Sequence, residues 1–306
     1  MHSGTVVFGT VFMDCKGFAA NRYDPLGRNV GSVRFIHGGV GRNVAENLAL
    51  AGSAPVFVSS VDAGGLGEEV LARLSAEGVD VSRVRRAEAS GMGIWLAVMD
   101  ERGELASSIS QMPDLSIMEA IIREEGEEII HGAESVILEI DLNDFISGEV
   151  LRLARKYSKK VYGITGNMEV VLRNRHFLRE LECYICNETE AGRLFGAPVP
   201  AGEPERVLET LVNYVDAERL KSMVVTLGGT GSVFYDGAER NGGFCPSLPT
   251  EVRDTSGAGD AYFSGTVEAM IRGIPLGDAV MYGTKLASWT IREEGPTCRT
   301  LPEPLF

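Results

Sequence analysis

The sequence has no excess of basic residues. Its 306 residues include 29 Lys and Arg against 43 Asp and Glu, which gives a net charge of −14. A nucleic acid would be repelled by this charge unless a strong basic stripe offset it, and the densest basic cluster is only Arg83, Arg85 and Arg86. We therefore expect no nucleic-acid partner and interpret these arginines as a solvated surface.

Long apolar runs and a cysteine framework are missing as well. No stretch approaches the ~20 apolar residues that span a bilayer, and the residues before Gly9 have the pattern of a first strand rather than a signal peptide. The cysteines number five and are scattered, which is typical of reduced thiols. Cys183 and Cys186 form a C-x-x-C pair without a second pair to complete a zinc site, so we assign them to core packing. We expect a cytoplasmic protein with no membrane partner.

Hydrophobic runs and helical patterns alternate along almost the whole chain. The predicted strands are Thr5–Val11, Val56–Val61, Ser135–Ile140, Lys160–Ile164, Cys183–Cys186 and Met223–Thr226. The predicted helices are Val44–Ala51, Glu68–Glu77, Ser116–His131, Ser147–Lys156, Glu205–Val215 and Ala258–Arg272. This alternation predicts an α/β protein with a mostly parallel sheet covered on both faces. At this length we expect one domain over residues 1–306.

Two segments interrupt the alternation, at about 12–37 and 91–111. In the second, Ile94–Met99 and Leu105–Ile109 flank the turn Asp100–Gly103, which is typical of a hairpin. Strands inserted early into such a domain are expected to form a small sheet that acts as a lid over the strand ends. An exposed lid edge either covers the substrate alone or pairs with a second subunit as a homodimer.

The segment Asp254–Gly265 carries the most specific pattern in the chain. Gly257 and Gly259 permit a sharp turn with exposed N–H groups, and the apolar run that follows predicts a helix whose N-terminus attracts a phosphate. Asp260 falls in the first helical turn, where it is placed to accept a proton from an attacking hydroxyl. An ordinary turn with a helix cap explains any three of these residues, but the run of twelve favours a phosphoryl-transfer site.

A second glycine cluster, Gly38–Gly41, precedes a helix. It matches neither G-x-G-x-x-G nor a P-loop, so it indicates neither a dinucleotide site nor a Walker motif. Backbone amides there suit a polar ligand such as a sugar, and Asn43 offers both a donor and an acceptor. Asp14 follows the first strand and is expected to reach the same cleft, although a tight turn and a surface carboxylate are the alternatives.

Two further strand ends carry polar or glycine-rich loops. Asn187–Glu190 offers carboxylates that bind Mg²⁺ directly or through water, and a helix cap with acidic first-turn residues explains the segment almost as well. Thr226–Gly231 is a glycine-rich loop suited to close approach by a nucleotide, with a hairpin turn as the alternative.

With these motifs in this order, the chain resembles the ribokinase family, also called the PfkB carbohydrate kinases, over essentially its whole length. Gly38–Asn43 is similar to the family's first signature, Asn187–Glu190 to its N-x-x-E motif, and Asp254–Asp260 to its D-T-x-G-A-G-D signature. The resemblance implies a Rossmann-like, three-layer (αβα) ribokinase-like fold with a small β-sheet lid. It also implies an ATP-dependent kinase that phosphorylates a hydroxyl of a sugar or nucleoside.

The resemblance assigns roles to individual residues. Asp260 is the implied catalytic base, and the anion hole is formed by the backbone of Gly257, Ala258 and Gly259. The sugar-binding positions match Asp14, Gly39 and Asn43, and Lys16 adds a cation nearby that selects an anionic substrate or lies on the surface. The nucleotide positions match Asn187, Thr226, Gly228 and Gly231. Mg²⁺ is implied at Glu190, bound directly or through water, and a monovalent cation such as K⁺ at Asp254 and Ser256.

Substrate choice rests on a short difference within the family. Gly38–Ala49 resembles the version found in pseudouridine kinases, whereas typical ribokinases have Lys-Gly-Ala-Asn in place of Val40–Asn43. The best prediction is therefore transfer of a phosphoryl group from ATP·Mg²⁺ to the 5′-hydroxyl of pseudouridine. A kinase of another sugar or sugar phosphate, a non-catalytic sugar or nucleoside sensor and, more remotely, a nicotinamide dehydrogenase are the alternatives. In the helix predicted over Tyr282–Ile291, Lys285 and Trp289 occupy positions where the family usually has small residues beside the adenine.

Overall fold

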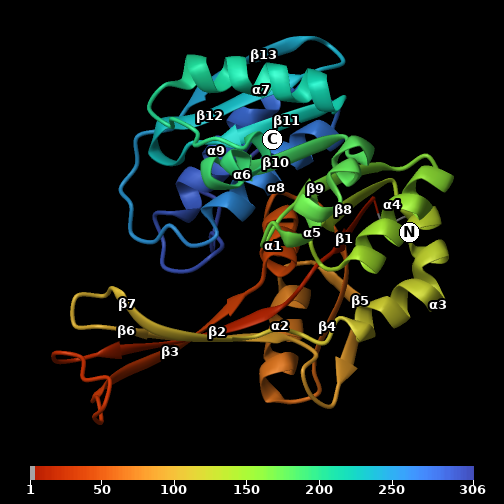
Figure 1. Ribbon diagram of the computed structural model, residues 1–306. Helices are drawn as coiled ribbons and strands as arrows, with labels where there is room; N and C mark the ends of the chain where they lie inside the picture. The colour runs from red at the N-terminus through yellow and green to blue at the C-terminus, as the bar shows by residue number, and fades with distance from the viewer. Residues whose placement is uncertain (1–3) are drawn as a thin grey trace.

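The computed structural model describes residues 4–306 and contains a large sheet and a small one (Figure 1). Residues 1–3, where the N-terminal segment discussed above begins, lie outside the described part of the chain. The large sheet has the order β13-β12-β11-β10-β9-β8-β1-β4-β5. Its strands are β1 (Thr5–Phe8), β4 (Val56–Asp62), β5 (Asp80–Ala87), β8 (Ser135–Glu139), β9 (Lys160–Ile164), β10 (Cys183–Asn187), β11 (Ser222–Thr226), β12 (Gly231–Asp236) and β13 (Asn241–Pro246).

The large sheet is parallel from β5 through β11, and only β12 and β13 run antiparallel to their neighbours. The sequence predicted the central parallel strands but missed β5, β12 and β13. Arginines interrupt the apolar pattern of β5, and β13 begins with Asn241-Gly242-Gly243, a composition typical of turns rather than strands. Tertiary pairing at the two edges of the sheet overrides these weak local preferences.

Helices cover both faces of this sheet, which makes the predicted three-layer arrangement. One face packs against α3 (Ser116–Gly132), α4 (Asp144–Lys156), α5 (Glu169–Arg173), α6 (Glu188–Phe195) and α7 (Pro204–Glu218), together with the 3-10 helix η1 (Arg175–Glu180). The other face packs against α1 (Val40–Leu50), α2 (Gly65–Ala76), α8 (Ala258–Ile271) and α9 (Leu276–Thr290). A short 3-10 turn, η2 (Gly228–Thr230), links β11 to β12.

Several element bounds differ from the predicted ones. Helix α1 begins at Val40 rather than Val44 and includes Gly41, while α9 begins directly after Pro275 rather than at Tyr282. Strand β1 ends at Phe8 rather than Val11, because the backbone at Gly9 turns to pack against Gly41. A Cβ atom built on Gly9 would lie 2.5 Å from the Cα atom of Gly41, so this helix–strand contact requires both glycines.

The small sheet is the predicted lid, and it projects away from the three layers (Figure 1). Its order is β3-β2-β6-β7, with strands β2 (Phe12–Ala19), β3 (Gly31–Gly38), β6 (Gly93–Met99) and β7 (Leu105–Gln111). Both segments that interrupt the alternation thus supply strands to this sheet, and β6 and β7 pair as the predicted hairpin. Strand β2 follows β1 closely and β3 leads directly into α1, so the glycine cluster Gly38–Gly41 lies where the lid meets the large sheet and its helices.

The sequence suggested that the arginines on β5 form a solvated surface, but two of them are held by carboxylates. Arg83 and Arg85 are partly buried and form ion pairs with Glu124, Glu125 and Glu128 of α3. The C-x-x-C cysteines lie on β10 and are buried, which confirms their role in core packing. None of the helices within residues 4–306 is long and apolar enough to cross a membrane.

Candidate active site

The predicted phosphate cradle lies at the N-terminus of α8. Gly257 is the N-cap residue with φ of 71°, and a Cβ atom there would lie 2.0 Å from the carbonyl oxygen of Pro296. Glycine is therefore required both for the left-handed backbone and for the packing of the C-terminal segment. Ala258 and Gly259 form the first turn, where the positive end of the helix dipole lies. The Ala258 amide donates a long hydrogen bond of 3.3 Å to the carbonyl oxygen of Thr255, which leaves the Gly259 amide as the freer donor of the two.

Asp260 occupies the first turn of α8, as predicted. Its Oδ2 atom accepts a hydrogen bond of 2.7 Å from Nδ2 of Asn43, which comes from α1. Burial raises the pKa of Asp260 to about 7, against the opposing effects of the Asn43 hydrogen bond and the positive charge of Arg42. A carboxyl group with a pKa near neutrality is suited to act as a general base, since it both loses and accepts a proton at working pH.

Asn43 reaches Asp260 because α1 starts unusually close to β1. Gly39 is the N-cap with φ of 99°, and a Cβ atom there would lie 2.5 Å from the carbonyl oxygen of Thr10. The Asn43 side chain is buried, and its Oδ1 atom has no hydrogen-bond partner within residues 4–306. This unused acceptor beside Asp260 is a fitting partner for a substrate hydroxyl.

Asp14 lies on β2, at the base of the lid. A Cβ atom on Gly38 would lie 3.0 Å from Oδ1 of Asp14, so the glycine leaves room for the carboxylate where β3 enters α1. Burial raises the pKa of Asp14, while the charges of Lys16 and Arg42 oppose that rise. The predicted sugar-binding positions Asp14, Gly39 and Asn43 therefore gather around one end of α1, next to Asp260.

The predicted nucleotide positions share a cleft of about 580 Å³. Asn187 stands at the end of β10 and Thr226 at the end of β11, and Gly228 and Gly231 belong to the loop that follows. Strand ends of a parallel sheet meet at one edge, which explains why these distant segments converge. The same cleft includes Ala258 and Gly259, so it is continuous with the phosphate cradle.

On helix α9, Lys285 and Trp289 do not lie where the sequence placed them, beside the adenine. Thr284, Ala287, Ser288 and Ile291 line the cleft, whereas Lys285 does not and instead pairs with Glu303. Trp289 is buried in a separate cluster with Ala51, Leu286 and Cys298. The spacing of the lining residues is helical, and Lys285 and Trp289 fall on the other face, so small side chains do border the cleft.

Asn187 and Glu190 form a reciprocal capping box at the start of α6. Oδ1 of Asn187 accepts a hydrogen bond of 2.9 Å from the Glu190 amide, and Oε2 of Glu190 accepts one of 3.0 Å from the Asn187 amide. The helix cap that was the alternative explanation for Asn187–Glu190 is therefore present. Burial raises the pKa of Glu190. No cluster of three metal-binding side chains occurs in residues 4–306, but one carboxylate with water and phosphate oxygens is a usual Mg²⁺ environment, so Glu190 fits that role.

Asp254 and Ser256 lie together in the loop before α8. Oδ1 of Asp254 accepts from the Ser256 amide at 2.9 Å, and Oδ2 accepts from the Gly295 amide at 3.2 Å. Asp254 thereby ties the cradle to the C-terminal segment that packs on Gly257. Both carboxylate oxygens are engaged in holding this loop.

Several polar groups near the site were not predicted. Glu139, at the end of β8, is buried and accepts hydrogen bonds from the amides of Thr10 and Gly41. Burial raises its pKa. The sequence did contain a signal for Glu139, because it is a charged residue near the end of the otherwise apolar run from Val136 to Ile140.

A second missed group is the buried pair of Arg42 and Glu46 on α1. The two side chains are 3.0 Å apart and almost fully buried, and Nη1 of Arg42 also donates to the carbonyl oxygen of His37. Glu46 accepts further hydrogen bonds from Arg73 and Thr297. The pair therefore joins the end of β3, α2 and the C-terminal segment, a convergence that no local sequence pattern indicates.

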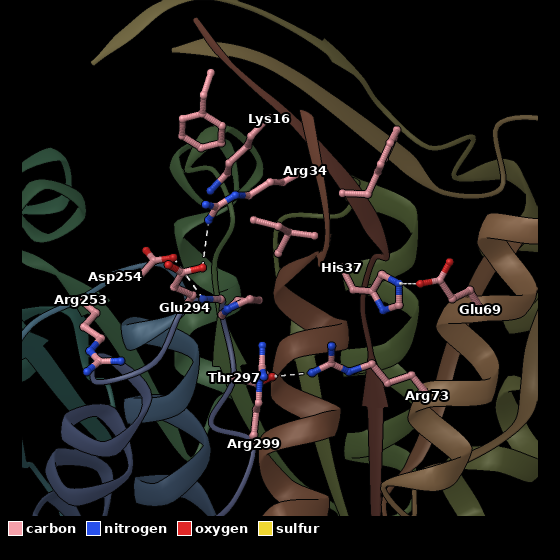
Figure 2. A pocket seen from close by; sticks show the side chains of 15 residues that line it. Lys16, Arg34, His37, Glu69, Arg73, Arg253, Asp254, Glu294, Thr297 and Arg299 are labelled. Carbon is pink, nitrogen blue, oxygen red and sulfur yellow. Dashed lines mark hydrogen bonds and ion pairs between the residues drawn. The ribbon is translucent and has the colours of Figure 1, made fainter. Parts of the chain in front are cut away.

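Lys16 lines a different cleft, of about 620 Å³, between the lid and the C-terminal segment. Figure 2 shows Lys16 and Arg34 reaching from the lid toward Asp254 and Glu294. Arg34 is paired with Glu294 at 2.9 Å, whereas within residues 4–306 Lys16 forms no ion pair and its Nζ atom lies 5.7 Å from the centroid of the Trp95 ring.

Comparison with known proteins agrees with this geometry. The model of the pfkB family carbohydrate kinases matches residues 3–303. Guanosine-inosine kinase from Exiguobacterium acetylicum is 33% identical over 285 residues, which are 93% of this chain and 93% of that protein. Pseudouridine kinase from Escherichia coli (strain K12) is 25% identical over 289 residues, 94% of this chain and 90% of that protein.

Solved structures show the same fold. Arabidopsis thaliana ribokinase complexed with ribose and ATP has a TM-score of 0.82 and 22% identity, covering 99% of this chain and 95% of that one. Ribokinase from Giardia lamblia has a TM-score of 0.84 and 15% identity, covering 99% and 97%. The fold is thus ribokinase-like, as expected. The family model and the 33% identical relative argue against the dehydrogenase alternative, and the chain belongs to the pfkB family of carbohydrate kinases, phosphotransferases that act on carbohydrates or nucleosides.

Proposed function

We propose that this protein is an ATP-dependent nucleoside kinase that phosphorylates a primary hydroxyl, with Asp260 as the general base. The observation that carries the proposal is the position of Asp260, which directly follows the cradle residues Ala258 and Gly259 on α8 and accepts a hydrogen bond from Asn43, a predicted sugar-binding residue. One helix turn thus places a base between an anion-binding backbone and a group that binds hydroxyls.

The reaction follows from these positions. The substrate hydroxyl donates its proton to Asp260 as its oxygen attacks the γ-phosphorus of ATP, and the bond from that phosphorus to the β–γ bridging oxygen breaks. Amides of Gly257, Ala258 and Gly259 are placed to stabilise negative charge on the transferred group. Asn187 and Glu190 would hold Mg²⁺ through water, and Mg²⁺ would neutralise phosphate charge.

The proposed substrates are guanosine and inosine, because the 33% identical relative carries that name and aligns over 93% of both chains. Pseudouridine is the second candidate. It is favoured by the Val40–Asn43 motif and by the 25% identical pseudouridine kinase, and it was the substrate predicted from the sequence. All three present a ribose with a free 5′-hydroxyl.

A substrate panel tests the assignment. The purified protein with ATP and MgCl₂ is assayed for ADP release with guanosine, inosine, pseudouridine, adenosine, ribose and fructose 6-phosphate. We expect the highest kcat/KM with a nucleoside, and Asp260→Asn should lower kcat about 10³-fold with little change in KM. A clear preference for ribose or fructose 6-phosphate contradicts the nucleoside assignment, and normal turnover by the Asp260 variant contradicts the mechanism.

We further propose two properties that the same panel does not address. A monovalent cation such as K⁺ would bind at the loop of Asp254 and Ser256. Asp254 accepts a hydrogen bond from Gly295, whose segment packs on Gly257, so a shift of this loop would move the cradle. Replacing KCl by tetramethylammonium chloride should then lower kcat, and an unchanged kcat argues against the site.

Two copies would pair through the outer face of the lid, which exposes apolar side chains.

A further inference from the structure

The strand register of the lid determines which side chains share the face that carries Asp14. Lys16 is two residues beyond Asp14 on β2, so both side chains point to the same side, about 7 Å apart along the strand. In the register, Arg34 of β3 is opposite Lys16, and Trp95 of β6 is beside Asp14. The lid therefore presents a carboxylate, an aromatic ring and two cations next to one another.

The cleft beside this face offers hydrogen-bond donors rather than acceptors. Besides Lys16 and Arg34, it is lined by Arg73, Arg253 and Arg299. Its three carboxylates already have partners, because Glu294 binds Arg34, Glu69 binds His37, and Asp254 accepts from two backbone amides. Among the cations, Arg253 and Arg299 also have carboxylate partners, Glu251 and Glu293, each at 4.0 Å.

Lys16 is the donor best placed for a ligand. Arg34 is paired with Glu294, and Arg73 is bound by Glu46 and Thr297. Within residues 4–306 the Lys16 ammonium forms no ion pair and lies over the Trp95 ring. If Asp14 accepts hydrogen bonds from the ribose hydroxyls, the base attached to that ribose is within reach of the neighbouring Lys16.

We propose, on the basis of the nucleoside kinase function above, that Lys16 is a specificity residue that selects bases bearing a carbonyl oxygen over bases bearing an amino group at the same position. Hypoxanthine and guanine present O6 and N7, both acceptors, which a lysine or arginine donor binds well. Uracil presents a carbonyl oxygen as well. Adenine presents an amino group at position 6, and an ammonium has no acceptor to offer it.

Trp95 has a different role in this proposal. An aromatic ring beside the ribose site stacks on any base, because every base has a π face. Trp95 therefore contributes affinity without discrimination, and Lys16 contributes the discrimination. This division explains how guanosine, inosine and pseudouridine, which differ in ring size, are accepted by similar sites.

The test compares inosine with adenosine, whose bases differ in the group at position 6 and in the proton on N1. For Lys16→Met we expect kcat/KM for inosine to fall about 10- to 100-fold while that for adenosine changes little, because a charge-assisted hydrogen bond to the carbonyl is lost. Lys16→Arg should restore the inosine preference. Trp95→Leu should weaken both substrates to a similar extent.

Arg253→Met is the matched control, since it removes a positive charge from the same cleft but belongs to the loop between β13 and α8 rather than to β2. It should leave the inosine-to-adenosine ratio unchanged, and the KM for ATP should be unchanged in the Lys16 variants. An unaltered ratio in Lys16→Met, or an equal change in Arg253→Met, overturns the inference while leaving nucleoside kinase activity intact. If the wild-type protein phosphorylates no nucleoside, or prefers a sugar phosphate, both proposals fail.

Discussion

Asp260 has neighbours with opposed effects on its charge. Burial favours the protonated carboxyl group and raises its pKa to about 7, whereas the Asn43 amide and the Arg42 guanidinium favour the carboxylate. The result is a base that is about half ionised near neutrality. Its proton affinity is then high enough to accept a proton from a hydroxyl without requiring an alkaline medium.

The pH dependence of turnover follows from this balance. A general base acts in its ionised form, so kcat/KM should rise with pH and level off above about 7. Asn43→Ala removes a hydrogen bond to the carboxylate, which raises the pKa of Asp260 further and moves the rising limb to higher pH. Measured pH profiles of both proteins check this. A limb that stays in place or moves to lower pH rules out Asp260 as the titrating group.

A substitution at Gly259 can test phosphate binding without disturbing the fold. A Cβ atom built there meets nothing within 4 Å, so Gly259→Ala should fold normally and change the free energy of unfolding by less than about 1 kcal/mol. If the transferred phosphoryl group lies against this backbone, the added methyl group blocks it and kcat falls. Urea denaturation and steady-state kinetics on the same preparation test both halves, and undiminished kcat would place the phosphate elsewhere.

At the scale of elements, the sequence predicted those parts of the site that lie in one contiguous motif. The cradle and Asp260 occupy a single turn of α8, so their spacing in the sequence was enough to predict that they lie together. Glu139 and the Arg42–Glu46 pair were missed because their partners come from other elements. The edge strands were missed for the same physical reason, since β13 is held by pairing with β12 rather than by its own propensity.

The Arg42–Glu46 pair is expected to hold α1, the end of β3 and the C-terminal segment together. Glu46→Ala leaves a fully buried arginine without its counter-charge, so we expect the free energy of unfolding to fall by about 3–5 kcal/mol. Glu149→Ala, which breaks an exposed pair with Arg152 on α4, should cost less than about 1 kcal/mol. Urea denaturation of both variants makes the comparison, and equal losses would mean that the buried pair has no special structural role.

At the scale of the whole molecule, the lid has one face toward the site and one toward solvent. Alternation along its strands places Val33, Phe35, Leu96 and Ile109 on the side opposite Asp14, with exposed fractions of 62%, 61%, 41% and 67%. A contiguous apolar face of this kind is typical of an interaction surface. A second copy of the chain supplies a matching apolar face, which supports the proposed homodimer.

Phe35→Lys should therefore convert the protein to a monomer, because it buries a charge at the centre of the proposed interface. Met281→Lys, at an exposed apolar position on α9, is the matched control and should remain dimeric. Each subunit carries a net charge of −14, so repulsion opposes pairing, and raising the salt concentration should strengthen the wild-type dimer by screening it. Sedimentation velocity over a range of protein and salt concentrations measures these effects. A wild-type protein that stays monomeric at the highest concentrations shows that the apolar face serves something other than self-association.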